Sequence, residues 1–212
     1  MKMIKRIYSR VYYEADKFLP PVIVRKGGEK IALICYIRNP FRKNANIFHS
    51  NVIEAILIAD SLCELGYTVK VVDYRYKGKI NYSTYNLIIG FGEPFRNSFG
   101  YYENKIRHVS YLTGANPSFS NYAEALRLKN FRLRNGVLLQ PQREVYWPWV
   151  FGVINSRSVI VVGNEWTAST YNGYNDNIFT VPVPFVCEPE LLKMEVDAKK
   201  HFVYFAGNGG VH

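Results

Sequence analysis

Residues 31–73 read IALICYIRNPFRKNANIFHSNVIEAILIADSLCELGYTVKVVD, and this stretch decides the fold. Its opening run IALICYI (31–37) is apolar throughout and has the length of a strand, and its closing run VKVVD (69–73) is mostly apolar and also has the length of a strand. An apolar run without alternation is typical of a strand buried on both faces, as in a parallel sheet covered by helices. The stretch therefore predicts two strands of such a sheet.

Residues 51–66, in the middle of this stretch, predict the helix that joins the two strands. Ser50 or Asn51 can cap its start, and Gly66 ends it. Glu54 stands three residues after Asn51, which completes a capping box. The polar side chains share one side of this helix: Glu54, Ser61 and Glu64. The other sides are apolar, so we expect the helix to pack on the sheet.

Further apolar runs predict strands at residues 87–91, 109–113, 158–162 and 178–183. Helices are expected between them, from residue 118 or 120 to 134 and from 165 to 171. Strands that alternate with helices predict an α/β fold, with a Rossmann-like, doubly wound and mostly parallel sheet that carries helices on both faces. The ligand of such a sheet lies at the carboxyl ends of its strands.

Composition indicates a globular protein. The chain has 212 residues, of which 48% are hydrophobic and 21% charged, and this favours one large domain or one domain with appendages. The cysteines are too few and too widely spaced for a disulfide framework or a zinc site: Cys35, Cys63 and Cys187. Neither a transmembrane run of roughly 18 apolar residues nor the apolar block of a signal peptide is found. We therefore expect a cytoplasmic protein, with peripheral contact at the inner face of the cell membrane.

Positive charge is concentrated near the start of the chain. The formal net charge is +10, and residues 1–43 hold eleven Lys or Arg against three acids, whereas residues 44–212 hold sixteen against fourteen. A nucleic-acid reader would carry its charge on the folded body, so no nucleic-acid partner is expected. Residues 1–18 predict a basic amphipathic helix held near an anionic membrane. A second basic run (127–143) is expected to be solvated or to meet acidic lipid headgroups.

Residues 201–206 (HFVYFA) predict one more strand, which runs directly into GNGGVH (207–212) with no helix after it. A strand followed by a glycine-rich loop is half of a βα unit. We therefore expect that the chain is cut from a longer protein.

Several segments, taken in order, resemble one family. They are the strand at 31–37, His49-Ser50-Asn51 before a helix that ends in Leu65-Gly66-Tyr67, the strand at 69–74, YLTGANP (111–117) and VVGNEWT (161–167). This pattern resembles the amino-terminal half of a GT-B fold glycosyltransferase and is most similar to bacterial enzymes that build surface polysaccharides. The resemblance covers residues 30–212.

The resemblance implies two Rossmann-like domains that face each other across a cleft, the first for the acceptor and the second for the nucleotide-sugar donor. Residues 1–30 would be a basic extension and 31–200 the acceptor-side domain. Residues 201–212 would begin a truncated donor domain, with the donor-binding residues Gly207, Gly209 and Gly210. The parent enzyme would transfer a sugar from a nucleotide sugar to a glycan or lipid-linked acceptor, without a metal or another cofactor. The chain alone would fold but transfer no sugar.

Candidate site residues lie in the loops that follow the predicted strands. His49, Glu93 and Glu165 are the candidate catalytic groups, because imidazole and carboxylate side chains act as general bases or position sugar hydroxyls. A loop histidine or an acid in the first turn of a helix also has ordinary structural roles, which remain alternatives. The candidate acceptor-binding residues are Arg38, Asn39, Arg42, Ser50, Thr113, Gly114, Asn116 and Asn164.

Two arginines of this set, Arg38 and Arg42, stand before a helix and would suit a phosphate-bearing ligand, or would belong to a solvated basic loop. The run Tyr146-Trp147-Pro148-Trp149 could offer flat faces to a sugar, although such clusters also occur in cores and interfaces. His108 and His201 stand at the other end of the sheet and are expected to be structural.

A rival function of a different class is a non-catalytic basic α/β binding module at a membrane surface or on nucleic acid. A glycine-rich continuation with a second set of strands and helices would favour the enzyme. Strong, salt-sensitive binding of RNA or DNA would favour the module.

Overall fold

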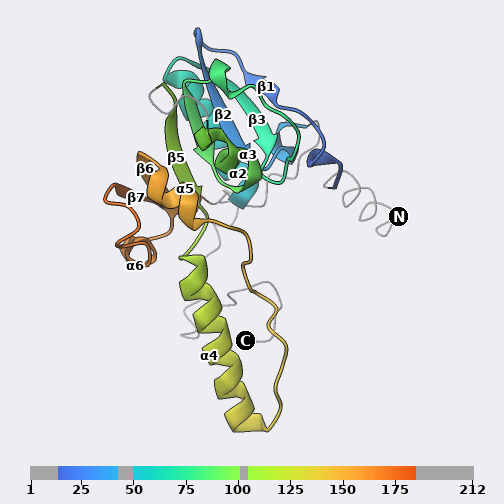
Figure 1. The fold of residues 1–212 in the computed structure, drawn as a ribbon, viewed down its shortest axis with the longest axis vertical. Helices are drawn as coiled ribbons and strands as arrows, with labels where there is room; N and C mark the ends of the chain where they lie inside the picture. Colours follow the sequence, from blue (N-terminus) through green and yellow to red (C-terminus); the bar gives the residue numbers. More distant parts are fainter. Residues whose placement is uncertain (1–13, 43–49, 101–104, 185–212) are drawn as a thin grey trace, which may run out of the picture.

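The computed structural model describes residues 14–42, 50–100 and 105–184 (Figure 1). Within these residues lies one seven-stranded sheet with the order β1-β3-β2-β4-β5-β6-β7. The strands are β1 (Val22–Arg25), β2 (Lys30–Tyr36), β3 (Tyr67–Asp73), β4 (Leu87–Gly90), β5 (Arg107–Leu112), β6 (Ser158–Val162) and β7 (Ile178–Val181). All neighbours run parallel except β1, which pairs antiparallel with β3 at one edge. The predicted Rossmann-like α/β fold with a mostly parallel sheet is confirmed.

Helices cover both faces of the sheet, and one further helix, α4 (Pro117–Asn135), projects away from it (Figure 1). The other helices are α2 (Ser50–Glu64), α3 (Gly92–Asn97), α5 (Val150–Asn155) and α6 (Glu165–Ser169), with single 3-10 turns η1 (Asn39–Phe41), η2 (Tyr82–Thr84) and η3 (Ser98–Gly100). α2 packs on one face through Ala55 and Ala59, beside Ile34 of β2. α3 packs on the opposite face through Phe95, beside Leu33.

The side chains of β2 alternate between these two packed faces, because successive residues of a strand point to opposite sides. Ala32, Ile34 and Tyr36 join the core under α2, whereas Leu33 and Cys35 join the core under α3. All five are at most 2% exposed. Burial on both faces is the physical reason for the unbroken apolar run at 31–37.

The structure differs from the sequence expectation in three elements. β1 adds an edge strand at Val22–Arg25, so the sheet begins before the expected domain boundary at residue 31. The helices α3 and α5 were not expected, because each has only six residues and starts without the side-chain cap that marks the still shorter α6. Residues 1–13 of the predicted N-terminal helix, Cys187 and residues 201–212 lie outside the described residues.

α4 and the extended segment after it form an arm (residues 117–149) that projects away from the sheet (Figure 1). The side chain of Asn121 donates to the carbonyl of Val145 at 3.0 Å and accepts from its amide at 2.9 Å. The carboxylate of Glu124 accepts from the amide of Gln142 at 3.4 Å. These bonds hold the returning segment along one face of α4.

Candidate functional site

A pocket of about 730 Å³ lies at the carboxyl ends of β2, β3, β4 and β5. β2 and β4 are neighbours in the sheet, but the chain passes from β2 through α2 to β3 on the other side, so the strand order reverses here. The crevice at such a reversal is where doubly wound sheets bind their ligands. The pocket therefore lies where the sequence analysis expected a ligand.

Aromatic rings form a connected wall of this pocket. The ring of Phe91, which follows β4, lies with its centroid 5.6 Å from that of Tyr36, 5.0 Å from that of Tyr74 and 5.3 Å from that of Trp147. Trp147 belongs to the arm and stacks on Phe91 with an interplanar angle of 28°. The arm thus supplies one wall of the pocket, and the mutual ring contacts favour a fixed wall.

The other lining side chains are mostly neutral. Five of them carry amide or hydroxyl groups: Asn39, Asn51, Thr113, Ser120 and Tyr171. Arg143, on the returning segment of the arm, is the one charged residue among the described residues that line the pocket. A pocket of this kind offers flat apolar faces, a few groups for hydrogen bonds and one positive charge.

Glu54 of α2 is buried, and its carboxylate fixes one residue of the aromatic wall. Its Oε2 oxygen accepts hydrogen bonds from the hydroxyls of Tyr36 at 3.0 Å and Tyr111 at 3.1 Å. The predicted capping box with Asn51 is wrong, because α2 already begins at Ser50 and the Glu54 carboxylate joins α2 to β2 and β5. Burial, followed by the neighbouring Glu54 charge, raises the pKa of both tyrosines, so both hydroxyls remain donors.

Three of the predicted acceptor-binding residues line the pocket: Asn39, Thr113 and Gly114. The hydroxyl of Tyr171, another lining residue, donates to the carbonyl of Gly114 at 3.0 Å. Asn116 is buried and caps α4, because its side-chain oxygen accepts from the backbone amide of Ser118 at 2.8 Å. Its side-chain NH2 group donates to the carbonyl of Thr170 at 3.0 Å. Asn116 thus shapes the loop beside the pocket.

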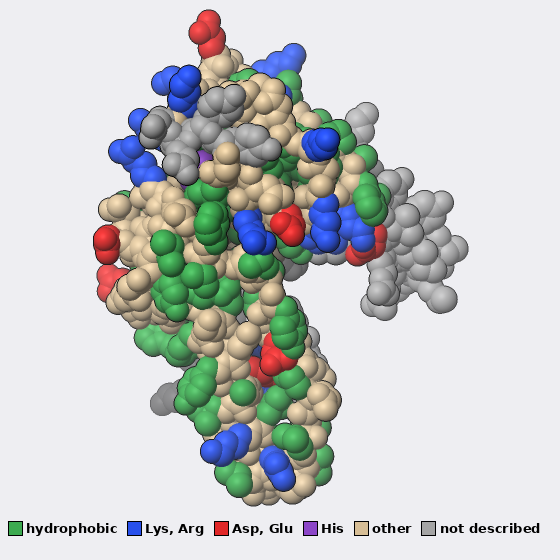
Figure 2. All heavy atoms as spheres, in the orientation of Figure 1, with side chains coloured by type: hydrophobic (Ala, Val, Ile, Leu, Met, Phe, Trp, Pro, Cys, Tyr) green, Lys and Arg blue, Asp and Glu red, His purple; other side chains and the backbone are tan. Residues whose placement is uncertain are grey.

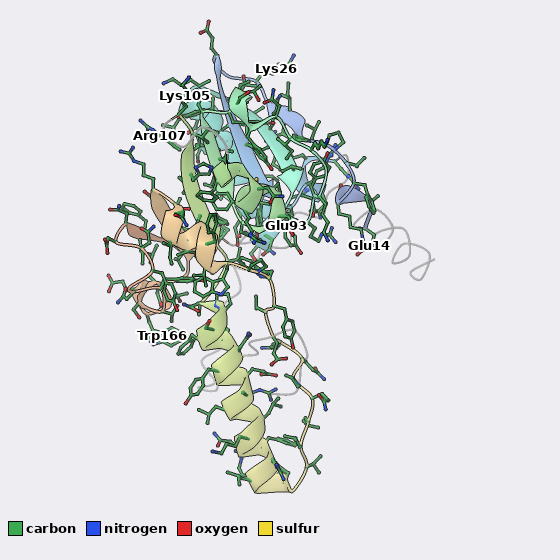
Figure 3. The ribbon with its side chains drawn as sticks, in the orientation of Figure 1. Glu14, Lys26, Glu93, Lys105, Arg107 and Trp166 are labelled. Atoms are coloured by element: carbon green, nitrogen blue, oxygen red, sulfur yellow. The ribbon has the colours of Figure 1, made fainter. Side chains whose placement is uncertain are left out.

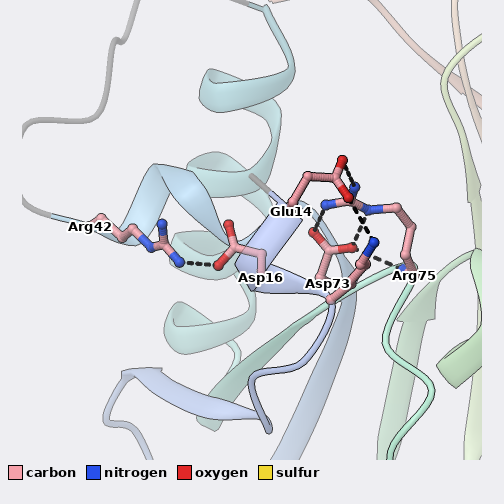
Figure 4. A network of polar contacts seen from close by, with 6 residues as sticks. Glu14, Asp16, Arg42, Asp73 and Arg75 are labelled. Atoms are coloured by element: carbon pink, nitrogen blue, oxygen red, sulfur yellow. Dashed lines mark hydrogen bonds and ion pairs between the residues drawn. The ribbon is translucent and has the colours of Figure 1, made fainter. Parts of the chain in front are cut away.

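The two predicted phosphate-binding arginines lie outside this pocket and line a separate depression beside β1. Arg42 forms an ion pair with Asp16, whose side chain is 1% exposed (Figure 4). Arg38 donates to the carbonyl of Pro20 at 2.8 Å. Desolvation raises the pKa of Asp16, and the charge of Arg42 opposes that shift. Both arginines therefore hold the segment before β1 against the body of the protein.

A second ion pair closes the turn after β3 (Figure 4). The buried carboxylate of Asp73 accepts from Nε of Arg75 at 2.8 Å and from its backbone amide at 3.0 Å. Arg75 also lies 3.5 Å from the carboxylate of Glu14. The start of the described chain is thus tied to the carboxyl end of β3.

The candidate catalytic acids do not line the pocket. Glu93 lies in the first turn of α3, and its backbone amide donates to the carbonyl of Tyr74 at 2.9 Å. It is therefore at the carboxyl end of the strands, the end from which the arm departs (Figure 3). Glu165 is exposed in the first turn of α6, which Asn164 caps by accepting from the amide of Thr167 at 3.0 Å. Ser50 is also absent from the described lining. His49, Gly207, Gly209 and Gly210 lie outside the described residues.

Sequence reasoning missed several lining residues, and most of them had a usable signal. Tyr36 ends β2, and Tyr74 and Phe91 directly follow β3 and β4, so each stands at a carboxyl strand end. Trp147 belongs to the aromatic run 146–149, whose rings could offer faces to a sugar, but the sequence does not place this run at the strand ends. No local signal connects Arg143 with the pocket, because it arrives on the returning segment of the arm.

Across residues 14–42, 50–100 and 105–184, no group of three or more His, Cys, Asp or Glu side chains is arranged to hold a metal ion. In the same described parts of the chain, no helix has both the length and the apolar character needed to cross a membrane. Compared with protein-family models, with curated proteins and with solved structures, the chain shows no match.

We expect that Arg42→Ala lowers stability, although Arg42 was a candidate for ligand binding. The substitution leaves the buried carboxylate of Asp16 without this ion pair, which costs about 2 kcal/mol because Arg42 itself remains partly exposed. Urea unfolding of the wild type, Arg42→Ala, Asp16→Asn and the double variant measures this coupling. Strictly additive losses in the double variant would contradict the pairing.

Proposed function

We propose that this chain is the acceptor-side domain of a GT-B fold glycosyltransferase. In the proposal, the pocket between β2 and β4 holds a sugar of a glycan or lipid-linked acceptor. The longer enzyme transfers a sugar to that acceptor from a nucleotide sugar bound by a second domain, in the cytoplasm and in polysaccharide biosynthesis. The observation that carries the proposal is an aromatic-walled pocket at the point where the strand order reverses.

The make-up of the pocket suits a sugar. A pyranose ring has an apolar C–H face that packs on an aromatic ring, and Phe91 and Trp147 supply such rings. Its hydroxyls both donate and accept hydrogen bonds, as the side chains of Asn39, Asn51 and Thr113 require. The nearly uncharged lining also favours a neutral polar ring over a highly charged ligand.

Arg143 supports a finer assignment within the same proposal. Its guanidinium pairs well with a carboxylate or a phosphate, because it presents several N–H donors in a plane. An acceptor that carries one anionic group next to a neutral ring would use both the cation and the aromatic wall. Acidic oligosaccharides and sugar phosphates belong to this class.

In the proposed longer enzyme, a carboxylate near the pocket would act in the transfer reaction. Glu93 is the described candidate with a direct link to the pocket, through the bond from its amide to the carbonyl of Tyr74. We propose that the Glu93 carboxylate acts there as the general base or as a hydrogen-bond partner of a sugar hydroxyl. The family resemblance implies a transfer without a metal, and the nucleotide sugar counts as a substrate and not as a cofactor.

We expect that Trp147→Ala weakens binding of oligosaccharides about tenfold, because it removes one aromatic face of the pocket. Calorimetric or NMR titration with matched neutral and acidic oligosaccharides measures the loss. Trp147→Phe should restore most of the affinity. Arg143→Gln should weaken the acidic ligands only.

Trp166→Ala is the matched control, because Trp166 is 60% exposed and lies outside the pocket lining. It should bind as the wild type does. Equal affinities of Trp147→Ala and the wild type for every saccharide would contradict the proposed site. Strong, salt-sensitive binding of RNA with no saccharide binding would instead favour the rival binding module.

A further inference from the structure

α4 carries an apolar stripe on its outer face. Phe119, Tyr122, Leu126 and Leu133 follow one another at helical spacings of three, four and seven residues, so they share one side of the helix. Their exposed fractions are 39%, 66%, 41% and 74%. A surface helix normally turns polar side chains towards solvent, whereas this side of α4 exposes apolar ones.

The opposite face of α4 is already packed. Glu124 and Leu128 are buried, and the returning segment of the arm is bonded to this face through Asn121 and Glu124. Phe119, at the start of the stripe, packs edge-to-face against Trp166 of α6, with ring centroids 5.3 Å apart. Tyr122, Leu126 and Leu133, further along the helix, are at least 41% exposed, so their apolar area is available to another surface.

Basic side chains flank the stripe. Lys129, Arg132 and Arg134 are exposed on the outer half of α4, and no acid occurs from Ala125 through Arg143. Beyond the end of the helix, Val137 and Leu138 add exposed apolar side chains, 54% and 61% accessible. Figure 2 shows hydrophobic and basic side chains together over this outer end of the arm.

We propose that the outer face of α4 docks on an anionic lipid surface. The helix is 19 residues long, or about 28 Å, and a helix that lies in the membrane interface buries its apolar face among the acyl chains while its basic residues meet the headgroups. Charge complementarity selects this partner, because the flanking charges are all positive. This inference does not depend on the proposed glycosyltransferase function or on membrane binding by residues 1–18.

The test is vesicle sedimentation of the full chain. Vesicles of phosphatidylcholine alone are compared with vesicles that contain about 30% phosphatidylserine, at low and high salt. One variant removes the charges (Lys129→Gln, Arg132→Gln, Arg134→Gln) and another the apolar stripe (Leu126→Ser, Leu133→Ser). The matched control removes three charges at the end of the sheet that lies away from the arm, where Figure 3 shows Lys26, Lys105 and Arg107. Its substitutions are Lys26→Gln, Lys105→Gln and Arg107→Gln.

We expect the wild type to bind the anionic vesicles in a salt-sensitive manner. The charge variant should bind about 100-fold more weakly, because each basic residue near such a surface contributes about fivefold. The stripe variant should also lose binding, and the control should retain it. All these side chains are exposed, so thermal melting of the variants should stay close to that of the wild type.

Three outcomes would overturn the inference. The first is equal binding by the wild type and both arm variants. The second is binding that is lost only when the basic residues of the N-terminal segment are neutralised: Lys2, Lys5, Arg6 and Arg10. The third is a wild-type dimer in sedimentation velocity that Leu133→Ser dissociates, which would assign the stripe to a second copy of the chain.

Discussion

Gly92→Ala is expected to cost more than about 4 kcal/mol of stability, which places it among the most damaging single substitutions. Gly92 follows β4 and has a φ of +84°, a conformation that L side chains rarely adopt. A Cβ atom there would lie 2.1 Å from the carbonyl oxygen of Tyr74. The backbone after β3 would have to move, and with it the bond from the amide of Glu93 to the same carbonyl.

Gly66→Ala separates these two causes. Gly66 has the same φ of +84°, but nothing lies within 4 Å of a Cβ built on it. This control should therefore lose only the conformational cost of about 1 kcal/mol. Thermal melting should show a drop of about 3 °C for Gly66→Ala and at least about 10 °C for Gly92→Ala. Equal drops would contradict the close approach between Gly92 and Tyr74.

The second large effect is a loss of stability in mild acid caused by His108. Its ring is buried between β5 and η3, stacks on Phe99 with centroids 4.1 Å apart, and lies 2.9 Å from the hydroxyl of Ser98. Desolvation lowers the pKa of His108 to about 4, against 6.5 for an ordinary histidine. The unfolded chain thus takes up a proton at this residue before the folded chain does.

The free energy of unfolding therefore falls as the pH falls. The stability due to neutral His108 is complete above pH 6.5 and is lost as the pH falls towards 4, because protons bind preferentially to the unfolded chain. The loss should reach about 2 kcal/mol at pH 5 and about 3 kcal/mol when complete. Urea unfolding at intervals from pH 7.5 to pH 5 measures it.

His108→Phe provides the comparison, since it keeps an aromatic ring but removes the titration. Its stability at pH 7.5 will differ, but its unfolding free energy should change less than that of the wild type between pH 7.5 and pH 5. Asp16 does not mimic the effect, because its raised pKa makes folded-state stability fall as the pH rises, in the opposite direction. Parallel pH profiles for wild type and variant would refute the assignment to His108.

Membrane binding by residues 1–18 remains a prediction, and the structure changes how it should be tested. Deleting residues 1–30 would remove β1, which pairs with β3, and also the buried Asp16. Loss of vesicle binding by such a deletion would then reflect damage to the fold. Neutralising the basic residues before Glu14 leaves both features intact.

The fold class of this protein can be predicted from local sequence patterns alone. Buried parallel strands need apolar side chains on both faces, and the helix between β2 and β3 needs a period near four, so both leave a local pattern that can be read directly. The same patterns predicted that a ligand would lie at the carboxyl strand ends. They did not reveal β1, whose side chains are exposed or half-buried at the sheet edge. They also did not reveal α3 or α5, which are six residues long and start without a side-chain cap, whereas the still shorter α6 starts at the capping residue Asn164.

Which side chains meet depends on how the elements pack in three dimensions. Glu54 reads as a capping acid along the helix, but two tyrosines from separate strands bury its carboxylate. Arg42 reads as a free cation in a loop, but its counter-ion Asp16 stands 26 residues earlier. Trp147 reaches Phe91 only because the returning segment of the arm runs back along α4 to the sheet. The physical reason is the same in each case: such contacts depend on strand order and chain return, which link residues far apart in sequence and leave no periodic signal around either one.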